Sequence, residues 1–146
     1  MTEFKRIGLV GRPDHSGVVD SLQRLLALLA TKELTVVLDD ITAGLIDSSG
    51  QQVCKREELS SHCDLVIVVG GDGSMLNVAK YVAADQVPVI GINRGRLGFL
   101  TDISPDDLEA RVEDVLSGKY SVESRFLLDV AIKRKDGLEI LGCALN

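Results

Sequence analysis

The sequence lacks the features that would place the chain in a membrane, outside the cell or around a structural metal. Its 146 residues include no tryptophan, three prolines and three cysteines. The longest apolar runs, residues 25–30 and 65–69, fall far short of the ~20 residues that a membrane-spanning helix needs. The cysteines are odd in number, widely spaced and without a CxxC pair, which disfavours a disulfide framework or a zinc site. We therefore expect buried free thiols in a cytoplasmic protein that has no signal peptide and no metal ligands of its own.

Basic charge and aromatic side chains are also scarce. The formal net charge of −6 disfavours non-specific binding to nucleic acids or to membrane surfaces, because a basic face mediates both. It leaves room for a local basic pocket that binds a phosphorylated ligand. Aromatic residues make up 3% of the chain and hydrophobic residues 45%, so the core should be aliphatic and built from packed layers of strands and helices.

Strand-like and helix-like segments alternate over residues 1–118. The run at 64–69 is apolar without interruption, as in a parallel strand that is covered on both faces. We expect strands at 5–10, 34–38, 64–69 and 88–92, and helices at 18–30, after Gly73 and from Ser104 to about Gly118. Residues 41–60 are weakly patterned and favour a variable loop with one helical turn. The alternation predicts an α/β fold with a doubly wound, mostly parallel sheet whose ligands bind at the carboxyl ends of the strands.

The last part of the chain has a different character. Residues 120–134 alternate like one long strand, with four apolar side chains on one face. The turn at 135–137 contains Asp-Gly, which is typical of a hairpin, and residues 138–146 return as its partner. A lone hairpin is only marginally stable. We therefore expect residues 1–118 to form an α/β nucleotide-binding catalytic domain, and residues 119–146 to open a second, antiparallel β-rich domain.

A glycine-rich turn with one carboxylate follows the clearest strand. Residues 70–74 read Gly-Gly-Asp-Gly-Ser. Glycines let the backbone approach a ligand closely, and the free N–H groups at the start of the next helix suit phosphate oxygens. We expect Gly71, Gly73 and Ser74 to present N–H groups to phosphate, and Asp72 to lie where it can take a proton from a hydroxyl. The alternative is an ordinary strand-to-helix turn in which Asp72 caps the helix.

A second glycine-rich segment follows the next strand. Residues 91–100 read Gly-Ile-Asn-Arg-Gly-Arg-Leu-Gly-Phe-Leu. Arg94 and Arg96 would either meet phosphate or be solvated, and these two interpretations stay open. Asn93 is a candidate cofactor-binding residue, and its side chain could instead hold the loop through bonds to the backbone. Phe99, taken without further context, favours the core.

Together the two segments, about twenty residues apart, resemble the NAD kinases, and the likeness runs from the first strand to the final hairpin. The resemblance implies transfer of the γ-phosphoryl group of ATP, or of polyphosphate, to the 2′-hydroxyl of the adenosine ribose of NAD, giving NADP. It implies that Asp72 is the proton acceptor, that Gly73 contacts the dinucleotide and that Phe99 lines the adenine pocket. It also matches Asn146 to the Asn of an Asn-acid pair that completes the NAD site.

Further expectations come with this resemblance. Mg²⁺ would accompany ATP, and the full-length enzyme would be a homo-oligomer. The family's β-rich second domain is only opened in this sequence, so we expect the fragment alone to be inactive or nearly so. We expect Asp72→Asn to keep the fold and NAD binding while lowering turnover.

Three other functions fit the sequence less well. A lipid kinase of the diacylglycerol or sphingosine type shares Gly-Gly-Asp-Gly but usually has a different second segment. A non-catalytic nucleotide-binding module would be better served by a neutral or basic residue at position 72. An oxidoreductase would need the dinucleotide fingerprint after the first strand, where it is absent.

Overall fold

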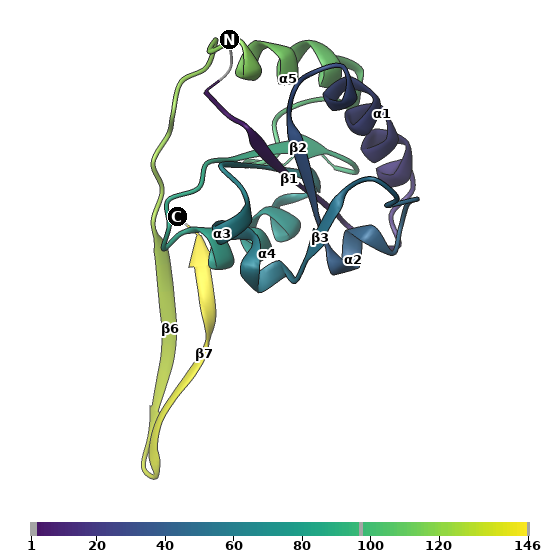
Figure 1. Cartoon of the computed structure of the whole chain (residues 1–146). Coiled ribbons are helices and arrows are strands. Elements are labelled where there is room, and N and C mark those ends of the chain that lie inside the picture. Colours follow the sequence, from purple (N-terminus) through teal and green to yellow (C-terminus); the bar gives the residue numbers. More distant parts are fainter. Residues whose placement is uncertain (1–2, 97, 146) are drawn as a thin grey trace.

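The computed structural model describes residues 3–96 and 98–145 and shows a five-stranded sheet with a separate hairpin (Figure 1). The five strands pair in the order β3-β2-β1-β4-β5, and every pairing between them is parallel. In chain order the elements are β1 (Arg6–Gly11), α1 (Val18–Ala30), β2 (Thr35–Asp39), α2 (Asp40–Ala43), β3 (Gln52–Cys54), η1 (Arg56–Glu58), α3 (Leu59–His62), β4 (Leu65–Gly70), α4 (Asp72–Val82), β5 (Val89–Asn93), η2 (Pro105–Asp107), α5 (Leu108–Leu116), β6 (Leu127–Arg134) and β7 (Gly137–Leu145).

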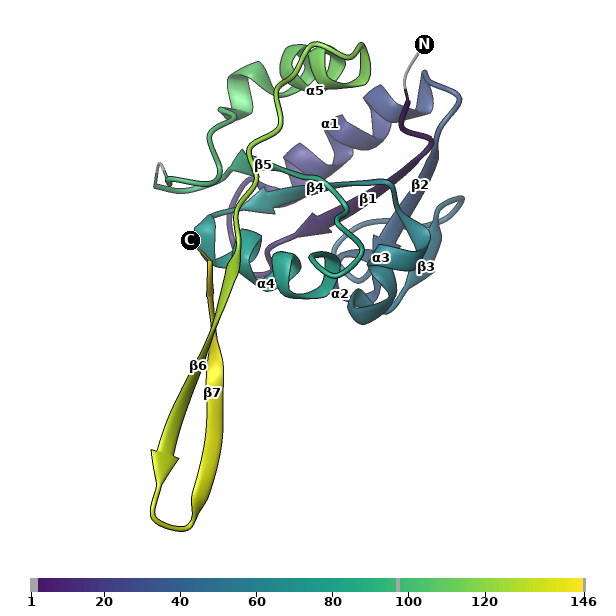
Figure 2. The same ribbon diagram turned by 90° about the vertical axis from the view of Figure 1, so that its left-hand side faces the viewer.

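Helices cover both faces of this sheet, as a doubly wound fold requires. Figure 2 shows α1 and α5 on one side of the strands and α3 and α4 on the other. Alternate residues of β4 belong to the two cores: Ile67 packs with the α1 and α5 side, whereas Val66 and Val68 pack with the α4 side. All six residues of β4 are buried, which confirms the strand predicted from its unbroken apolar run.

The predicted helices have clear physical causes. Helix α1 spans the predicted residues and buries its apolar stripe on the sheet. Ser104 accepts a hydrogen bond from the Asp106 N–H, and Pro105 occupies the first position of η2, which continues into α5. Gly118, with φ of +84°, follows the end of α5.

Two predictions of secondary structure need correction. Residues 41–60 are more ordered than the predicted loop, since they contain part of α2, the edge strand β3, η1 and the start of α3. A strand of three residues is too short to show a period in the sequence. The long strand expected at 120–134 begins only at Leu127, because residues 121–126 have no partner strand to bond.

The hairpin β6–β7 projects away from the sheet in both views (Figures 1 and 2). The loop between the strands is Lys135–Asp136, one residue shorter than expected, because Gly137 pairs with Arg134 and is already part of β7. Phe126 and the β6 residues Leu128, Val130 and Ile132 are all exposed. No helix in the described ranges is long and apolar enough to cross a bilayer.

Candidate functional site

The direction of the chain across the sheet reverses between β1 and β4. From β1 the strands proceed to β2 and β3 on one side, while β4 and β5 lie on the other. The loops that leave the carboxyl ends of β1 and β4 therefore diverge, which in sheets of this kind opens a crevice for ligands. At this point the Arg12 N–H donates to the Val69 carbonyl at 2.9 Å, so the two strand ends are held side by side. The glycine-rich segment 70–74 begins here.

Asp72 is the first residue of α4 rather than its cap. Gly71 occupies the cap position in an extended conformation and provides no side-chain bond to the helix. The free N–H groups of the first turn therefore point out at the switch point, next to a carboxylate. The alternative in which Asp72 merely caps its own helix is wrong in this structure.

The carboxylate of Asp72 instead binds the second glycine-rich segment. Its Oδ2 accepts from the Phe99 N–H at 2.8 Å, and its Oδ1 accepts from the Leu100 and Thr101 N–H groups at 2.9 and 3.3 Å. Gly98 makes this approach possible, since a Cβ atom there would overlap the carboxylate of Asp72. Both predicted motifs thus meet at one residue.

These contacts set the ionisation of Asp72. Partial desolvation opposes the charged form, but the backbone N–H groups of Leu100, Phe99 and Thr101 outweigh it and lower the pKa of Asp72 below its ordinary value. The carboxylate is therefore an ionised hydrogen-bond acceptor at neutral pH.

Other predicted residues of the first segment lie around this carboxylate. A Cβ atom on Gly71 or Gly73 would meet nothing within 4 Å, so the backbone faces open space at both positions. The Ser74 side chain lies over Gly70, where an added Cβ would come within 2.6 Å of its Oγ. These positions leave the backbone of the first helical turn accessible to a ligand.

Asn93 ends β5 on the α4 side of the sheet. Residues 91 and 93 share a face, and a Cβ atom on Gly91 would meet Met75 and Thr101. Asn93 is 6% exposed, and neither its Oδ1 nor the Oγ1 of Thr101 has a hydrogen-bond partner in the part of the chain that is described. Its backbone N–H donates to the Ile103 carbonyl at 2.8 Å. The predicted side-chain bonds from Asn93 to the loop are therefore not seen.

Phe99 is not a core residue, because 97% of its surface is exposed. It lines a cavity of about 770 Å³. The walls come from α4, β5, residues 99–103 and the segment 121–127, and Leu145 closes one side. Apolar groups and the charged side chains of Asp102, Glu123 and Arg125 line it together.

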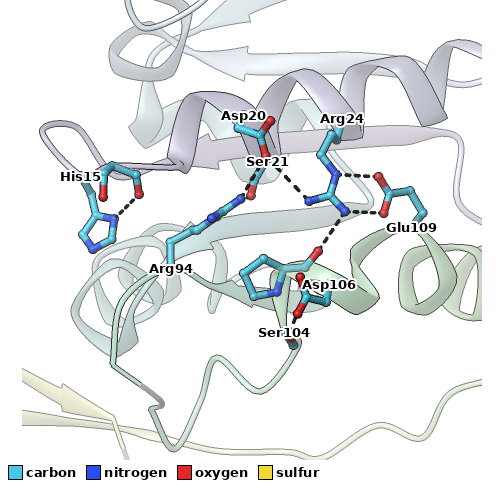
Figure 3. Close-up of polar contacts among 10 residues, drawn as sticks. His15, Asp20, Ser21, Arg24, Arg94, Ser104, Asp106 and Glu109 are labelled. Carbon is cyan, nitrogen blue, oxygen red and sulfur yellow. Dashed lines mark hydrogen bonds and ion pairs between the residues drawn. The ribbon is translucent and has the colours of Figure 1, made fainter.

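Arg94 is committed to α1, as Figure 3 shows. Its Nε donates to Ser21 Oγ at 2.7 Å and its Nη2 to Asp20 Oδ2 at 3.1 Å. Gly17, with φ of +83°, leaves space for the guanidinium, since a Cβ atom there would lie 2.5 Å from Nη1. Neither prediction for Arg94, phosphate contact or free solvation, describes this arrangement. Arg96 is exposed.

Two features escaped the sequence analysis. Arg12 follows β1, is exposed, and has its Cβ beside Gly70, so it supplies a cation at the switch point. Asp39, which ends β2, is fully buried and pairs with Arg56 at 2.6 Å. Arg56 also donates to Asn77 Oδ1 on α4 at 2.8 Å. The sequence signal for part of this network was a capping pattern, in which Asp39 ends a strand and Thr42 follows three residues later.

The three cysteines are not among the residues that line the cavity or contact Asp72. Cys63 is buried against the sheet, and burial raises the pKa of its thiol to about 12. Cys54 and Cys143 are half-buried rather than buried, and all three thiols are free. Residues 3–96 and 98–145 contain no group of three His, Cys, Asp or Glu side chains that is arranged to hold a metal ion.

Comparisons with known proteins identify relatives of this chain. The NAD kinase of Azotobacter vinelandii is 52% identical over 142 residues, which are 97% of this chain and 48% of that protein. The NAD kinase of Hahella chejuensis is 49% identical over 146 residues, 100% of this chain and 49% of that protein. The chain thus spans about half the length of these curated relatives.

Solved structures show the same fold. Yeast NADH kinase complexed with NADH has a TM-score of 0.79 at 18% identity, over 97% of this chain and 46% of that one. An NAD kinase from Archaeoglobus fulgidus in complex with ATP has a TM-score of 0.56 at 28% identity, over 91% of this chain and 45% of that one. Residues 7–120 match the family described as the ATP-NAD kinase N-terminal domain. The chain therefore belongs to the ATP-NAD kinase family, and most of it is that N-terminal domain.

Proposed function

We propose that this chain carries the catalytic aspartate of an NAD kinase, which transfers the γ-phosphoryl group of ATP to the 2′-hydroxyl of the adenosine ribose of NAD and forms NADP. The observation that supports the proposal best is the meeting of the two glycine-rich segments at Asp72, at the switch point of the sheet. Family membership and the nucleotides bound in the two similar structures support the same chemistry.

In this proposal Asp72 orients the acceptor hydroxyl and takes its proton. Phosphoryl transfer needs mainly positioning and neutralisation of charge, so a weakly basic carboxylate suffices if its geometry is right. The N–H groups at Gly73 and Ser74 would bind phosphate oxygens at the start of α4. Arg12 would add positive charge on the β1 side of the crevice. Mg²⁺ would arrive with the phosphates of ATP, as part of that substrate.

NAD, the acceptor, would bind on the side of Asp72 where Phe99 lies. The exposed Phe99 ring would stack on adenine, next to the large cavity between α4 and the segment 121–127. Gly71 and Gly73 leave space for the sugar and its phosphates, and the unpaired Oδ1 of Asn93 lies on the same side of the sheet. Asn146, the expected start of an Asn-acid pair, lies outside the described residues and stays part of the proposal.

Residues 119–146 would open the second, β-rich domain, and residues 1–118 would be the catalytic α/β domain. The exposed apolar face of β6 supports this division, since a solvent-exposed strand face of this kind needs a covering layer. We further propose a cytoplasmic location, which suits three free thiols, and assembly of the complete enzyme into a homo-oligomer.

The test is an NADP-forming assay on the chain extended to the length of its relatives, with ATP and polyphosphate as separate donors. We expect NADP formation with the extended protein, little with residues 1–146 alone, and a loss of ~10²-fold or more in turnover for Asp72→Asn. Unchanged turnover in that variant would remove Asp72 from the catalytic role. A lipid substrate assayed in parallel distinguishes NAD kinase from lipid kinase activity.

A further inference from the structure

One side chain, Asp72, supplies the side-chain hydrogen bonds found in the segment that follows Gly98, while Leu100 and Thr101 also pack against the α4 side of the sheet. Its far end is tied to β5 at Ile103, whose carbonyl accepts from the Asn93 N–H at 2.8 Å and whose N–H donates to the Gly91 carbonyl at 3.3 Å. Before Ile103, the hydrogen bonds found for residues 98–102 in the described part of the chain all go to Asp72. The Phe99 side chain adds no anchor, since it is almost fully exposed.

The two oxygens of Asp72 are used unequally. An ionised carboxylate has about four lone-pair sites, two on each oxygen. Among the described residues, Oδ1 accepts from both Leu100 and Thr101, which fills it, whereas Oδ2 accepts from Phe99 alone. Oδ2 therefore keeps one site for a further hydrogen-bond donor, such as a sugar hydroxyl.

We propose that Asp72 is also the anchor of residues 98–101: Oδ1 holds the loop that carries Phe99, and Oδ2 receives the acceptor hydroxyl. The role of Oδ2 toward the acceptor hydroxyl rests on the proposed function, whereas the anchoring of the loop does not depend on any nucleotide. One carboxylate thereby positions the ring beside the binding cavity and the hydroxyl that reacts.

This division of roles changes what Asp72→Asn should do. An asparagine has one carbonyl oxygen without charge, and its amide group would face N–H donors instead of accepting from them. The loop would then lose bonds to a charged acceptor, which are stronger than bonds to a neutral one. The affinity for NAD should therefore fall together with turnover, in contrast to the retained binding expected for an isolated catalytic base.

Hydrogen exchange measured by NMR on the 146-residue chain, without any nucleotide, tests the anchor. In Asp72→Asn we expect the Leu100 and Thr101 amides to exchange at least about tenfold faster than in the unmodified chain. Gly98→Ala is the second variant, because it keeps the charge of Asp72 but places a methyl group against the carboxylate. It should raise the same two exchange rates. Asp102→Asn, a matched change at an exposed neighbour that makes no hydrogen bond to the loop within the described residues, should leave them unchanged.

Amides in β4 report whether each variant remains folded. If β4 stays protected and the Leu100 and Thr101 amides of Asp72→Asn exchange as slowly as in the unmodified chain, the anchor does not exist. If Asp72→Asn unfolds the chain, Gly98→Ala decides by the same criterion. In the extended protein, NAD affinity should fall at least about tenfold in both variants. If the loop loosens as expected in the variants but the unmodified extended protein forms no NADP, the proposed function is refuted and the anchor remains.

Discussion

Two strands of the sheet end near an aspartate, and the two aspartates are held in different ways. Asp39, the last residue of β2, is fully buried and forms an ion pair with Arg56, besides accepting from the Thr42 N–H at 3.1 Å. Asp72, just beyond β4, is only partly buried and is held by three backbone N–H groups, and no cation among the described residues forms an ion pair with it. The first charge is neutralised inside the protein, whereas the second remains available to whatever enters the crevice.

The difference shows how a carboxylate can be held in a fixed position and still keep a free hydrogen-bonding site. The guanidinium of Arg56 neutralises the charge of Asp39, and burial prevents a ligand from reaching that carboxylate. Backbone amides fix the direction of Asp72 but leave one lone pair of Oδ2 free. The arrangement suggests that Asp39 maintains the position of α4 through Arg56 and Asn77, while Asp72 acts on the ligand.

Removing the buried charge should have the largest effect on stability. Asp39→Asn leaves the half-buried guanidinium of Arg56 without its charged partner, and we expect the free energy of unfolding to fall by about 3–5 kcal/mol. Urea unfolding of the 146-residue chain, followed by circular dichroism, measures it. Asp40→Asn, an adjacent exposed position, is the control and should change stability little. A loss of similar size in both variants would show that the ion pair has no special role.

A steric change on the Asp72 side should come next. Gly91→Ala places a Cβ atom 2.7 Å from Thr101 Cγ2 and 2.8 Å from Met75 Cε. Because the side chains of Thr101 and Met75 are both buried, we expect the free energy of unfolding to fall by about 1–3 kcal/mol. Gly71→Ala, where a Cβ atom meets nothing within 4 Å, serves as the control in the same unfolding measurement. Equal stability of the two variants would contradict the packing described for the loop.

Much of this comparison could be predicted from the sequence. The unbroken apolar run before Gly70 indicated a buried parallel strand, and both glycine-rich segments follow strands, so both lie at the carboxyl edge of the sheet where ligands were expected. Helical periodicity predicted α1 to the residue. These are effects of local pattern and of topology, which a sequence records directly.

The Asp39 side was missed because its parts are distant in sequence and short in length. Strand β3 has three residues, too few for a period, and it is the turn after β3 that brings Arg56 to Asp39. The bond from Arg94 to Ser21 joins residues 73 positions apart and depends on the reach of one long side chain. No propensity or spacing in the sequence contains such a contact before the fold is known.

Arg94 provides a smaller test, since it links the β5 end to α1. We expect Arg94→Ala to lower the free energy of unfolding by about 1 kcal/mol, because its partner Asp20 is well exposed and the ion pair is screened. Arg96→Ala is the control at an exposed position two residues away. A nucleotide titration of both variants separates the alternatives. If Arg94 bound phosphate, Arg94→Ala would lower the affinity for nucleotide without changing the free energy of unfolding.

The smallest expected effect is the dependence of stability on pH that Asp72 contributes. Its pKa is lower in the folded chain than in the unfolded one, so its contribution is present above the ordinary aspartate pKa of about 3.9 and is lost as the pH falls through the folded value. Glu109, whose pKa Arg24 lowers through a side-chain hydrogen bond, contributes in the same direction. The difference between the unmodified chain and Asp72→Asn isolates Asp72 from this background. Unfolding free energies measured between about pH 7 and about pH 3 should show that difference shrinking on acidification. A difference that stays constant over this range would mean that the three N–H groups do not favour the ionised carboxylate, and the contrast with Asp39 would lose its electrostatic basis.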